Sequence, residues 1–244
     1  MQNKNLKILA IIPARGGSKG IPLKNIKKLD KLPLVAHTIQ DAKISKQINR
    51  IIVSTDNKKI AEISKKYGAE CPFLRPKSFS KDSSSTLDVI QHTIRFLKEV
   101  ENYIPDIVVI LLPTSPFRSL NLIDDSIKLL RKTNATSVVN VAKNKDHAFK
   151  AFLLKDDFLK PFKINHKKYY QRQLFPDFFH TTGSVYTFWL TTLKKYGHYY
   201  GPRMKPIVTN DDKMNLDIDN IFDFFMAEMT QKYWKSYLKK NQNN

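Results

Sequence analysis

One loop of the chain has residue types that suit the binding of phosphate groups. It follows the apolar run Ile8–Ile12 and reads Pro13-Ala14-Arg15-Gly16-Gly17-Ser18-Lys19-Gly20-Ile21-Pro22-Leu23-Lys24-Asn25. Its glycines allow a ligand to approach the backbone closely, while the arginine and lysines supply positive charge and the serine a hydroxyl donor. The loop lacks both the Gly-Lys-Ser/Thr ending of a Walker A motif and the spacing of a dinucleotide fingerprint. It therefore predicts a phosphate site of another kind.

Two carboxylates near the C-terminus have the spacing of a cation site. Asp217 and Asp219 are two residues apart, so their side chains face the same way if the backbone is extended. Hard carboxylate oxygens suit Mg²⁺, which keeps waters and takes phosphate oxygens as further ligands. The alternative for such a pair is stabilisation of a helix N-terminus. Asp223 lies further on, where we expect it to cap the following helix or to support the pair.

The elements that must position these groups alternate along the chain. Apolar, β-rich runs occur at Ile8–Ile12, Arg50–Ser54, Ile107–Leu112 and Ser137–Val141. Helical periodicity separates them, and Ser85-Thr86-Leu87-Asp88 has the form of a capping box that opens a helix. Runs without polar alternation suit strands buried on both faces, which predicts βαβ units around a largely parallel sheet. The glycine loop would then lie at the carboxyl end of a strand, where open α/β sheets bind ligands.

The pattern changes beyond the fourth run. The stretch 143–176 is rich in Lys, Phe, Tyr and His and lacks clean periodicity. Strand-like segments follow at Gly183–Tyr186 and Pro206–Val208, and Ile221–Leu238 is an aromatic-rich amphipathic helix. We therefore expect one α/β domain over residues 1–244, with a protruding segment at 143–180.

The charge balance calls for a test of nucleic-acid binding. The 244 residues include 42 Lys and Arg against 22 Asp and Glu, a formal net charge of +20. The lysines are spread through every segment without a run of five or six basic residues, and base-reading proteins favour arginine. We expect a lysine-rich surface with a small anion site rather than a nucleic-acid stripe. The single cysteine, Cys71, excludes a disulfide framework and a cysteine-based zinc site.

Targeting and membrane signals are weak. Lys4 and Lys7 precede a short apolar run, but Pro13 and Arg15 interrupt it far short of a signal-peptide core. The other apolar run, Ile107–Leu112, cannot span a bilayer. We expect a cytoplasmic protein without a membrane partner.

Several short motifs in a fixed order carry a resemblance to a known family. They are the glycine loop, Ser54-Thr55-Asp56, Leu74-Arg75-Pro76, Leu112-Pro113-Thr114-Ser115-Pro116-Phe117-Arg118, and Asp217-Ile218-Asp219 with Asp223. Over residues 6–228 this set resembles the acylneuraminate cytidylyltransferase family, which includes the CMP-sialic acid synthetases. The resemblance implies a Rossmann-like nucleotidyltransferase fold with helices on both faces of the sheet. It also implies a homodimer in which the protruding segment at 143–180 reaches the acceptor site of the partner.

The resemblance implies transfer of CMP from CTP to the anomeric 2-hydroxyl of a nonulosonic acid. Pyrophosphate is released, Mg²⁺ is the cofactor, and the acceptor is of the sialic, legionaminic or pseudaminic type, activated for surface polysaccharide synthesis. Two alternatives remain. One is a nucleotidyltransferase for KDO or another sugar, and the other, of a different class, is a basic nucleic-acid-binding protein.

The resemblance also assigns roles to residues. The nucleotide-binding set is Ala14, Arg15, Gly16, Gly17, Ser18, Lys24, Asn25, Arg75 and Thr86. The catalytic set is Arg15, Lys24, Asp217 and Asp219, and the last two of these are also the metal ligands. The acceptor-binding set is Thr114, Ser115, Lys150 and Arg172.

Three positions depart from the pattern of the sialic-acid enzymes. Leu112 stands where relatives have Gln, His180 where many have Arg, and Thr182 where they have Asn. All three fall on the predicted acceptor side. The resemblance therefore favours legionaminate, pseudaminate or another modified nonulosonate at least as much as N-acetylneuraminate.

Overall fold

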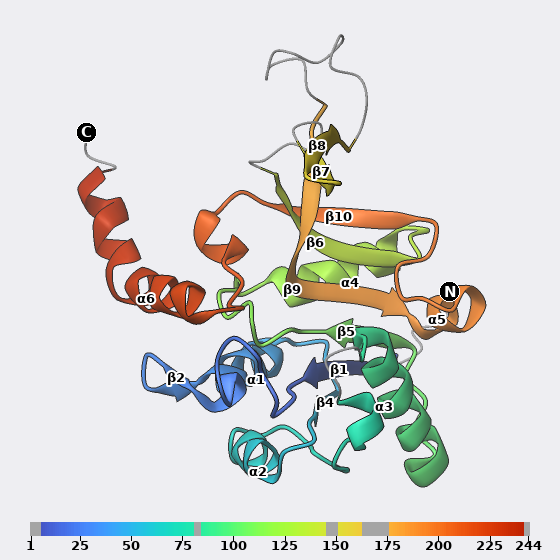
Figure 1. Cartoon of the computed structure of the whole chain (residues 1–244). Helices are drawn as coiled ribbons and strands as arrows, with labels where there is room; N and C mark the ends of the chain where they lie inside the picture. Colours follow the sequence, from blue (N-terminus) through green and yellow to red (C-terminus); the bar gives the residue numbers. More distant parts are fainter. Residues whose placement is uncertain (1–5, 81–83, 145–150, 163–175, 242–244) are drawn as a thin grey trace.

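A mixed sheet forms the centre of the computed structural model, which describes residues 6–80, 84–144, 151–162 and 176–241 (Figure 1). Within these ranges the sheet has six strands in the order β10-β6-β9-β5-β1-β4. They are β1 (Ile8–Pro13), β4 (Arg50–Ser54), β5 (Ile107–Ile110), β6 (Ser137–Lys143), β9 (Phe179–Trp189) and β10 (Met204–Thr209). All neighbouring strands are parallel except where β9 pairs with β5 and β6. The prediction of a largely parallel sheet is confirmed.

Helices cover both faces of the sheet, as predicted. They are α1 (Leu34–Ile44), α2 (Lys58–Lys66), α3 (Thr86–Glu101), α4 (Leu122–Lys132) and α5 (Leu190–Tyr196). Ala10 and Ile12 of β1 pack with α1, α2 and α4, whereas Leu9 and Ile11 pack with α3 and α5. All four side chains are fully buried. Burial on both faces explains why the apolar runs show no polar alternation.

The capping box of α3 is present as the sequence predicts. The Ser85 hydroxyl accepts a hydrogen bond from the Asp88 backbone N–H at 3.2 Å, and the Asp88 carboxylate accepts one from the Ser85 N–H at 2.8 Å. These contacts satisfy two N–H groups that the first helical turn leaves unpaired. They also fix the end of the helix that faces the carboxyl edge of the sheet.

The second half of the chain differs from the sequence expectation in detail. The predicted strand Gly183–Tyr186 is the middle of the eleven-residue β9, which runs antiparallel and shifts register against β6 between Val139 and Val141. The short helix α5 follows it directly and was not among the elements predicted from the sequence. β5 ends at Ile110, two residues earlier than expected.

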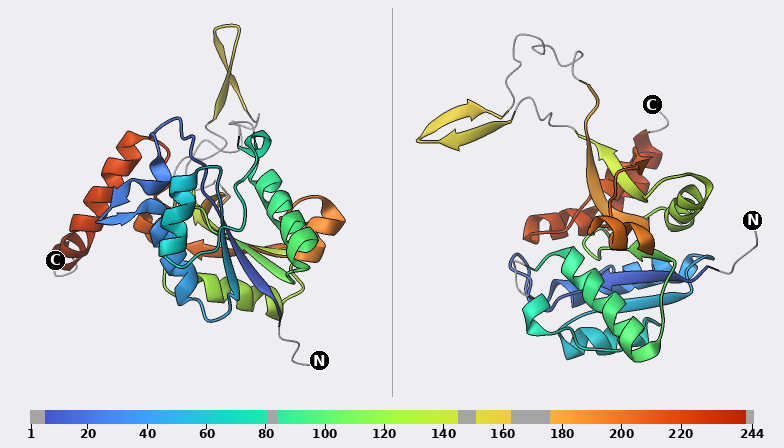
Figure 2. Two further views of the ribbon diagram at one scale, coloured as in Figure 1. Left: turned by 90° about the horizontal axis from the view of Figure 1, so that it is seen from below. Right: turned by 90° about the vertical axis from the view of Figure 1, so that its right-hand side faces the viewer.

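Small hairpins extend from this body. β2 (Lys28–Leu29) pairs with β3 (Leu32–Pro33), and β7 (Phe152–Lys155) pairs with β8 (Phe158–Pro161). Figure 2 shows the β7–β8 hairpin projecting far from the central sheet. The predicted protruding segment thus includes a hairpin. Its strands were not predicted, because this part of the sequence lacks clean periodicity.

The last helix packs against the glycine loop. α6 (Ile221–Asn241) packs Phe224 and Ala227 onto Ile21 of that loop and onto Ile218, in an apolar cluster separate from the two faces of the sheet. Short 3-10 turns lie at Lys24–Ile26, Lys77–Phe79 and Asp212–Asn215. None of the helices in the described ranges combines the length and apolar character needed to cross a bilayer.

The packing of α3 predicts a large difference between two of its residues. Leu97 is fully buried against the sheet, whereas Val100 is 65% exposed. Leu97→Ala should lower the free energy of unfolding by about 2–5 kcal/mol, because it removes buried methyl groups and leaves a cavity. Val100→Ala is the matched control and should change it by no more than about 0.5 kcal/mol. Urea titrations of both variants measure this, and equal losses would contradict the packing described.

Candidate active site

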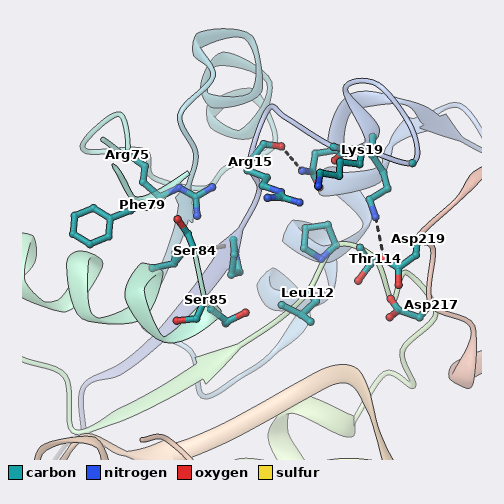
Figure 3. A pocket seen from close by; sticks show the side chains of 18 residues that line it. Arg15, Lys19, Arg75, Phe79, Ser84, Ser85, Leu112, Thr114, Asp217 and Asp219 are labelled. Carbon is teal, nitrogen blue, oxygen red and sulfur yellow. Dashed lines mark hydrogen bonds and ion pairs between the residues drawn. The ribbon is translucent and has the colours of Figure 1, made fainter. Parts of the chain in front are cut away.

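A cavity of about 450 Å³ lies at the carboxyl end of the central strands, as the glycine loop predicts. Figure 3 shows Arg75 and Phe79 at one end, Asp217 and Asp219 at the other, and Arg15 between them. The predicted site residues that line it are Arg15, Ser18, Lys24, Asn25, Arg75, Thr86, Thr114, Asp217 and Asp219. The fold therefore gathers residues from both ends of the chain around one space.

The start of the glycine loop is anchored to the segment that follows β4. Ala14 donates its N–H to the Ser54 carbonyl at 2.9 Å, and Gly16 donates to the Asp56 carboxylate at 2.8 Å. The Ser54-Thr55-Asp56 motif thus holds the loop. Ala14, Gly16 and Gly17 do not line the cavity. Their predicted nucleotide contacts stay predictions.

The end of the loop turns its polar groups inward. Leu23 has a left-handed backbone with φ of 51°, which is uncommon outside glycine and gathers at functional sites. Asn25 donates its side-chain N–H to the Arg15 carbonyl at 2.8 Å. Lys24 is 8% exposed, and its ammonium donates to the Ile218 carbonyl at 2.5 Å and lies 3.4 Å from an Asp219 oxygen. The loop is thereby tied to the carboxylate pair.

Gly20 makes a second contact between the same two segments. A Cβ atom at this position would lie 2.2 Å from the Asp219 carbonyl oxygen, far inside the distance of ordinary contact. Glycine is therefore required here by the close approach of two backbones. Gly17 faces open space instead: apart from its neighbours in the chain, no described residue has an atom within 4 Å of the corresponding position.

Arg75 places a cation with unsatisfied donors at the other end of the cavity. Its backbone N–H bonds the Thr55 carbonyl at 2.7 Å, and the residue is 5% exposed. Within the described part of the chain, its Nε and Nη2 atoms have no hydrogen-bond partner. Burial lowers the pKa of Arg75, Asp56 opposes that shift, and the positive charge of Arg15 adds to it. A buried guanidinium in this state favours an incoming acceptor atom.

Asp217 and Asp219 share one wall of the cavity, as their spacing predicts. Withdrawal from water raises the pKa of Asp217, and a hydrogen bond from the Thr114 side chain opposes that rise. The negative charge of Asp219 raises it further, while Lys24 lowers it. An added cation would relieve this crowding of negative charge.

The remaining acid of the motif has a different role. The Asp223 carboxylate accepts hydrogen bonds from the backbone N–H groups of Asp219 at 2.9 Å and Asn220 at 3.0 Å. It thus caps α6 and holds the backbone of the pair. Among the residues described, no three His, Cys, Asp or Glu side chains gather as a self-sufficient metal site. Two carboxylates fit an ion such as Mg²⁺, which completes its shell with water and phosphate oxygens.

The predicted acceptor side is only partly described. Thr114 lines the cavity, and its carbonyl accepts the Ile218 N–H at 2.8 Å. Ser115 is fully buried and donates its hydroxyl to the Thr182 carbonyl at 2.9 Å, so its side chain packs β9 rather than lining the cavity. Lys150 and Arg172 lie outside the described residues.

Residues that sequence reasoning did not place in the site complete its walls. Phe79, Ser84, Ser85 and Val89 line the cavity between Arg75 and the start of α3. The sequence contained a partial signal for these residues. The capping box predicts a helix N-terminus at Ser85, and the neighbouring Thr86 was already predicted to bind the nucleotide.

The family of the chain follows from a match over most of its length. A family model described as cytidylyltransferase matches residues 9–224. The chain belongs to this cytidylyltransferase family. The resemblance found in the ordered motifs is thereby confirmed, and so is the assignment of the chain to nucleotidyltransferase enzymes.

Relatives of this cytidylyltransferase include enzymes for several acceptors. It is 31% identical to the CMP-N,N'-diacetyllegionaminic acid synthase of Legionella pneumophila, over 91% of this chain and 95% of that one. It is 30% identical to the N-acylneuraminate cytidylyltransferase of Escherichia coli, over 93% of this chain but only 52% of the longer relative. A pseudaminic acid cytidylyltransferase of Campylobacter jejuni is 42% identical over 48% of this chain and 50% of its own length.

Solved structures support the fold of the cytidylyltransferase. A CMP:2-keto-3-deoxy-manno-octonic acid synthetase complexed with CTP has a TM-score of 0.63 and 14% identity, covering 92% of this chain and 98% of that one. A 4-diphosphocytidyl-2C-methyl-D-erythritol synthase from Anaerococcus prevotii has a TM-score of 0.62 and 17% identity, covering 97% and 100%. The predicted nucleotidyltransferase fold is confirmed.

The close contact at Gly20 yields a prediction about stability. Gly20→Ala should lower the free energy of unfolding by about 1–3 kcal/mol, because the backbone of Asp219 must move to admit a methyl group. Gly17→Ala, in the same loop but facing open space, should leave stability unchanged or raise it by about 0.4–1 kcal/mol. Denaturant titration compares the two variants. Equal stabilities would show that the two backbones do not approach so closely.

Proposed function

We propose that this cytidylyltransferase transfers CMP from CTP to the anomeric 2-hydroxyl of a nonulosonic acid and releases pyrophosphate. The observation that carries the proposal is one cavity in which Arg15, Lys24 and Arg75 stand with a carboxylate pair. The substrate class rests on the relatives, whose names specify legionaminic, acylneuraminic and pseudaminic acids. The reaction belongs to surface polysaccharide synthesis, and we expect it in the cytoplasm.

The nucleotide would lie along the cavity from Arg75 to the glycine loop. Arg15 and Lys24, with Ser18 and the loop N–H groups, would neutralise the triphosphate. Arg75 and Thr86 would contact the cytidine side, where the unpaired Nε and Nη2 donors of Arg75 support a direct hydrogen bond. Asn25 would then act near the nucleoside while its amide holds the loop through Arg15.

The chemical step is an in-line displacement at the α-phosphorus. A new bond forms between the acceptor oxygen and phosphorus, the bond to the bridging oxygen of pyrophosphate breaks, and the hydroxyl proton leaves. Arg15 and Lys24 would stabilise the negative charge that grows on the leaving group, which is the main demand of phosphoryl transfer. Asp217 and Asp219 would hold Mg²⁺, which supplies charge stabilisation and lowers the pKa of the attacking hydroxyl.

The acceptor would occupy the side of the cavity near Thr114. Leu112 lines this side in place of the glutamine of sialic-acid enzymes, which supports an acceptor with a different substituent pattern. Ser115 would support this side indirectly, by holding the turn against β9. We also propose that Lys150 and Arg172 contact the acceptor, and that Arg172 forms a bidentate pair with the acceptor's carboxylate.

We also propose a homodimer of one domain, 1–244, in which the segment 143–180 covers the partner's acceptor side. Support comes from the β7–β8 hairpin. Register places Phe152 opposite Pro161 and Leu154 opposite Leu159, so one of its faces is wholly apolar. Phe152, Leu154 and Leu159 are 50%, 72% and 66% exposed. An isolated two-stranded hairpin is marginal in water, so contact with a second copy would stabilise it.

The direct test incubates the chain with CTP, Mg²⁺ and a panel of nonulosonic acids, and measures pyrophosphate and product mass. The panel contains N-acetylneuraminate, legionaminate, pseudaminate and, as the shorter sugar acid, KDO. We expect a CMP-sugar with a nonulosonate. Product from KDO alone would support the KDO alternative. No product with any acceptor, together with salt-sensitive binding to DNA or RNA, would support the nucleic-acid alternative.

The carboxylate pair predicts a loss of catalysis. Asp219→Asn should lower kcat about 100-fold or more, because a neutral amide cannot help hold the cation that stabilises the phosphate charge. Asp125→Asn is the control, since Asp125 lies exposed on α4 and, within the described ranges, its carboxylate pairs with Lys128 alone, at 3.4 Å. Steady-state assays across Mg²⁺ concentrations compare the two variants. Near-normal activity of the Asp219 variant would exclude its metal role.

The unpaired donors of Arg75 predict a loss of nucleotide affinity. Arg75→Gln should raise the KM for CTP roughly 10–100-fold, because a hydrogen bond from a charged donor contributes about 1.5–3 kcal/mol. The exposed Arg95 on α3 supplies the control variant Arg95→Gln, for which we expect an unchanged KM. Calorimetric titration measures the dissociation constant for CTP of each variant in the absence of an acceptor. Equal affinities of the two variants would show that Arg75 does not bind the nucleotide.

A further inference from the structure

Arg118 is a buried cation that links three elements behind the cavity. Its side chain is 1% exposed, although it follows the cavity-lining turn by only a few residues. Nε donates to the Ser184 carbonyl of β9 at 2.8 Å. Nη1 donates to the Thr38 hydroxyl at 3.1 Å and to the Asp41 carboxylate at 3.2 Å, both on α1. Nη2 donates to the Leu112 carbonyl.

These contacts leave little freedom to the turn between β5 and α4. The turn begins at Leu112, whose carbonyl is fixed, and returns at Arg118, whose guanidinium is held by β9 and α1. Ser115 adds a bond from the middle of the turn to the Thr182 carbonyl at 2.9 Å. The planar guanidinium spreads its donors over three separate nitrogen atoms and so reaches all four acceptors at once. A lysine ammonium has its three donors on a single nitrogen and cannot span them.

The turn in its fixed position supports the carboxylate pair. The Thr114 carbonyl accepts the N–H of Ile218, the residue between Asp217 and Asp219, at 2.8 Å. A continuous set of contacts therefore runs from Arg118 through the turn to the backbone of the carboxylate pair, although Arg118 itself does not line the cavity.

We propose that Arg118 is a positioning residue for the transfer reaction. Through the Thr114 carbonyl and its bond to the Ile218 N–H, it sets the position of the backbone that carries Asp217 and Asp219 toward the cation. The proposal rests on the function proposed above and adds to it a residue that touches neither substrate nor cation. Its counter-ion is Asp41, which offsets the cost of burying the guanidinium. Groups that orient a metal ligand from behind commonly change activity or metal affinity about 10–100-fold when they are lost.

The test compares Arg118→Lys with Arg131→Lys in the full chain. Arg131 is exposed on α4 and donates a hydrogen bond to the Gln47 side chain at 3.4 Å. Its variant is a matched control, because it makes the same Arg-to-Lys exchange without changing the charge. Circular dichroism and thermal unfolding establish a temperature at which each variant is folded. At that temperature we measure kcat, the KM for CTP and the binding of Mn²⁺ by electron paramagnetic resonance.

For Arg118→Lys we expect kcat to fall about tenfold or more and Mn²⁺ affinity to fall by a similar factor. The KM for CTP should stay within about twofold, because Arg75 and Arg15 approach the cavity from other segments. A folded variant with normal kcat and Mn²⁺ affinity would overturn the proposal. So would a lower Tm as its only change, which would leave Arg118 a purely structural contact.

Two further measurements keep the outcome clear. If Arg118→Lys does not fold, the variant Thr38→Val is used instead, because it removes one acceptor of the Arg118 guanidinium. It should produce a smaller fall in both kcat and Mn²⁺ affinity. If neither quantity changes, the proposal is overturned. The Mn²⁺ titration needs no acceptor, so it tests Arg118 even if no nonulosonate is turned over. Failure of the wild-type chain in the acceptor panel would count against the proposed function, whereas equal Mn²⁺ binding by wild type and variant counts against Arg118.

Discussion

The contact between the Lys24 ammonium and the Ile218–Asp219 segment joins parts of the chain that lie 194 and 195 positions apart. It brings the glycine loop, which begins at the end of β1, against the segment that precedes α6. Because the ammonium is buried, it must keep these acceptors or suffer a large desolvation cost. The contact therefore fixes the distance between the cationic and anionic walls of the cavity, and Gly20 makes the fit tighter by admitting the Asp219 backbone.

The cavity holds charges that are incompletely matched by the protein itself. In the part of the chain that the structure describes, two donors of the buried Arg75 have no partner, and burial raises the pKa of Asp217. Each condition raises the free energy of the folded chain, and a ligand of opposite charge or hydrogen-bonding character would relieve it. Such a site gains selectivity for a ligand that carries both anionic groups and a bound cation. The net charge of +20 acts at longer range, by drawing anionic substrates toward the cavity.

Much of the fold could be predicted from the sequence because its signals are local. Fully apolar strands, the Ser85–Asp88 capping box and the phosphate loop each occupy one short stretch and depend on their own residues. The direction of β9 could not be predicted, since a strand reads alike in both directions and its register with β6 contains an irregularity. The β7–β8 hairpin could not be predicted for another reason. Its strands do not alternate strictly between apolar and polar residues, which is the pattern expected when one face of a strand is buried.

The candidate site was predicted best where a motif contains its own chemistry. Asp217 and Asp219 share a wall because of their spacing, and Arg15 and Lys24 face the cavity because the loop folds back. Arg118 belongs to a recognised motif, yet its role depends on Thr38, Asp41 and Ser184, which are 66–80 positions away. Contacts of that range are set by the topology of the sheet, and a linear pattern does not contain them.

The pairing of β6 with β9 has an evolutionary consequence. Lys143 lies opposite Phe179 at the end of the paired region, so the chain leaves the sheet and returns to it at neighbouring points. A segment bounded in this way can lengthen, shorten or change sequence at little entropic cost and without disturbing the strands beneath it. In the homodimer proposed above, acceptor preference could therefore diversify by exchange of this one insertion, while the residues around the glycine loop stay the same.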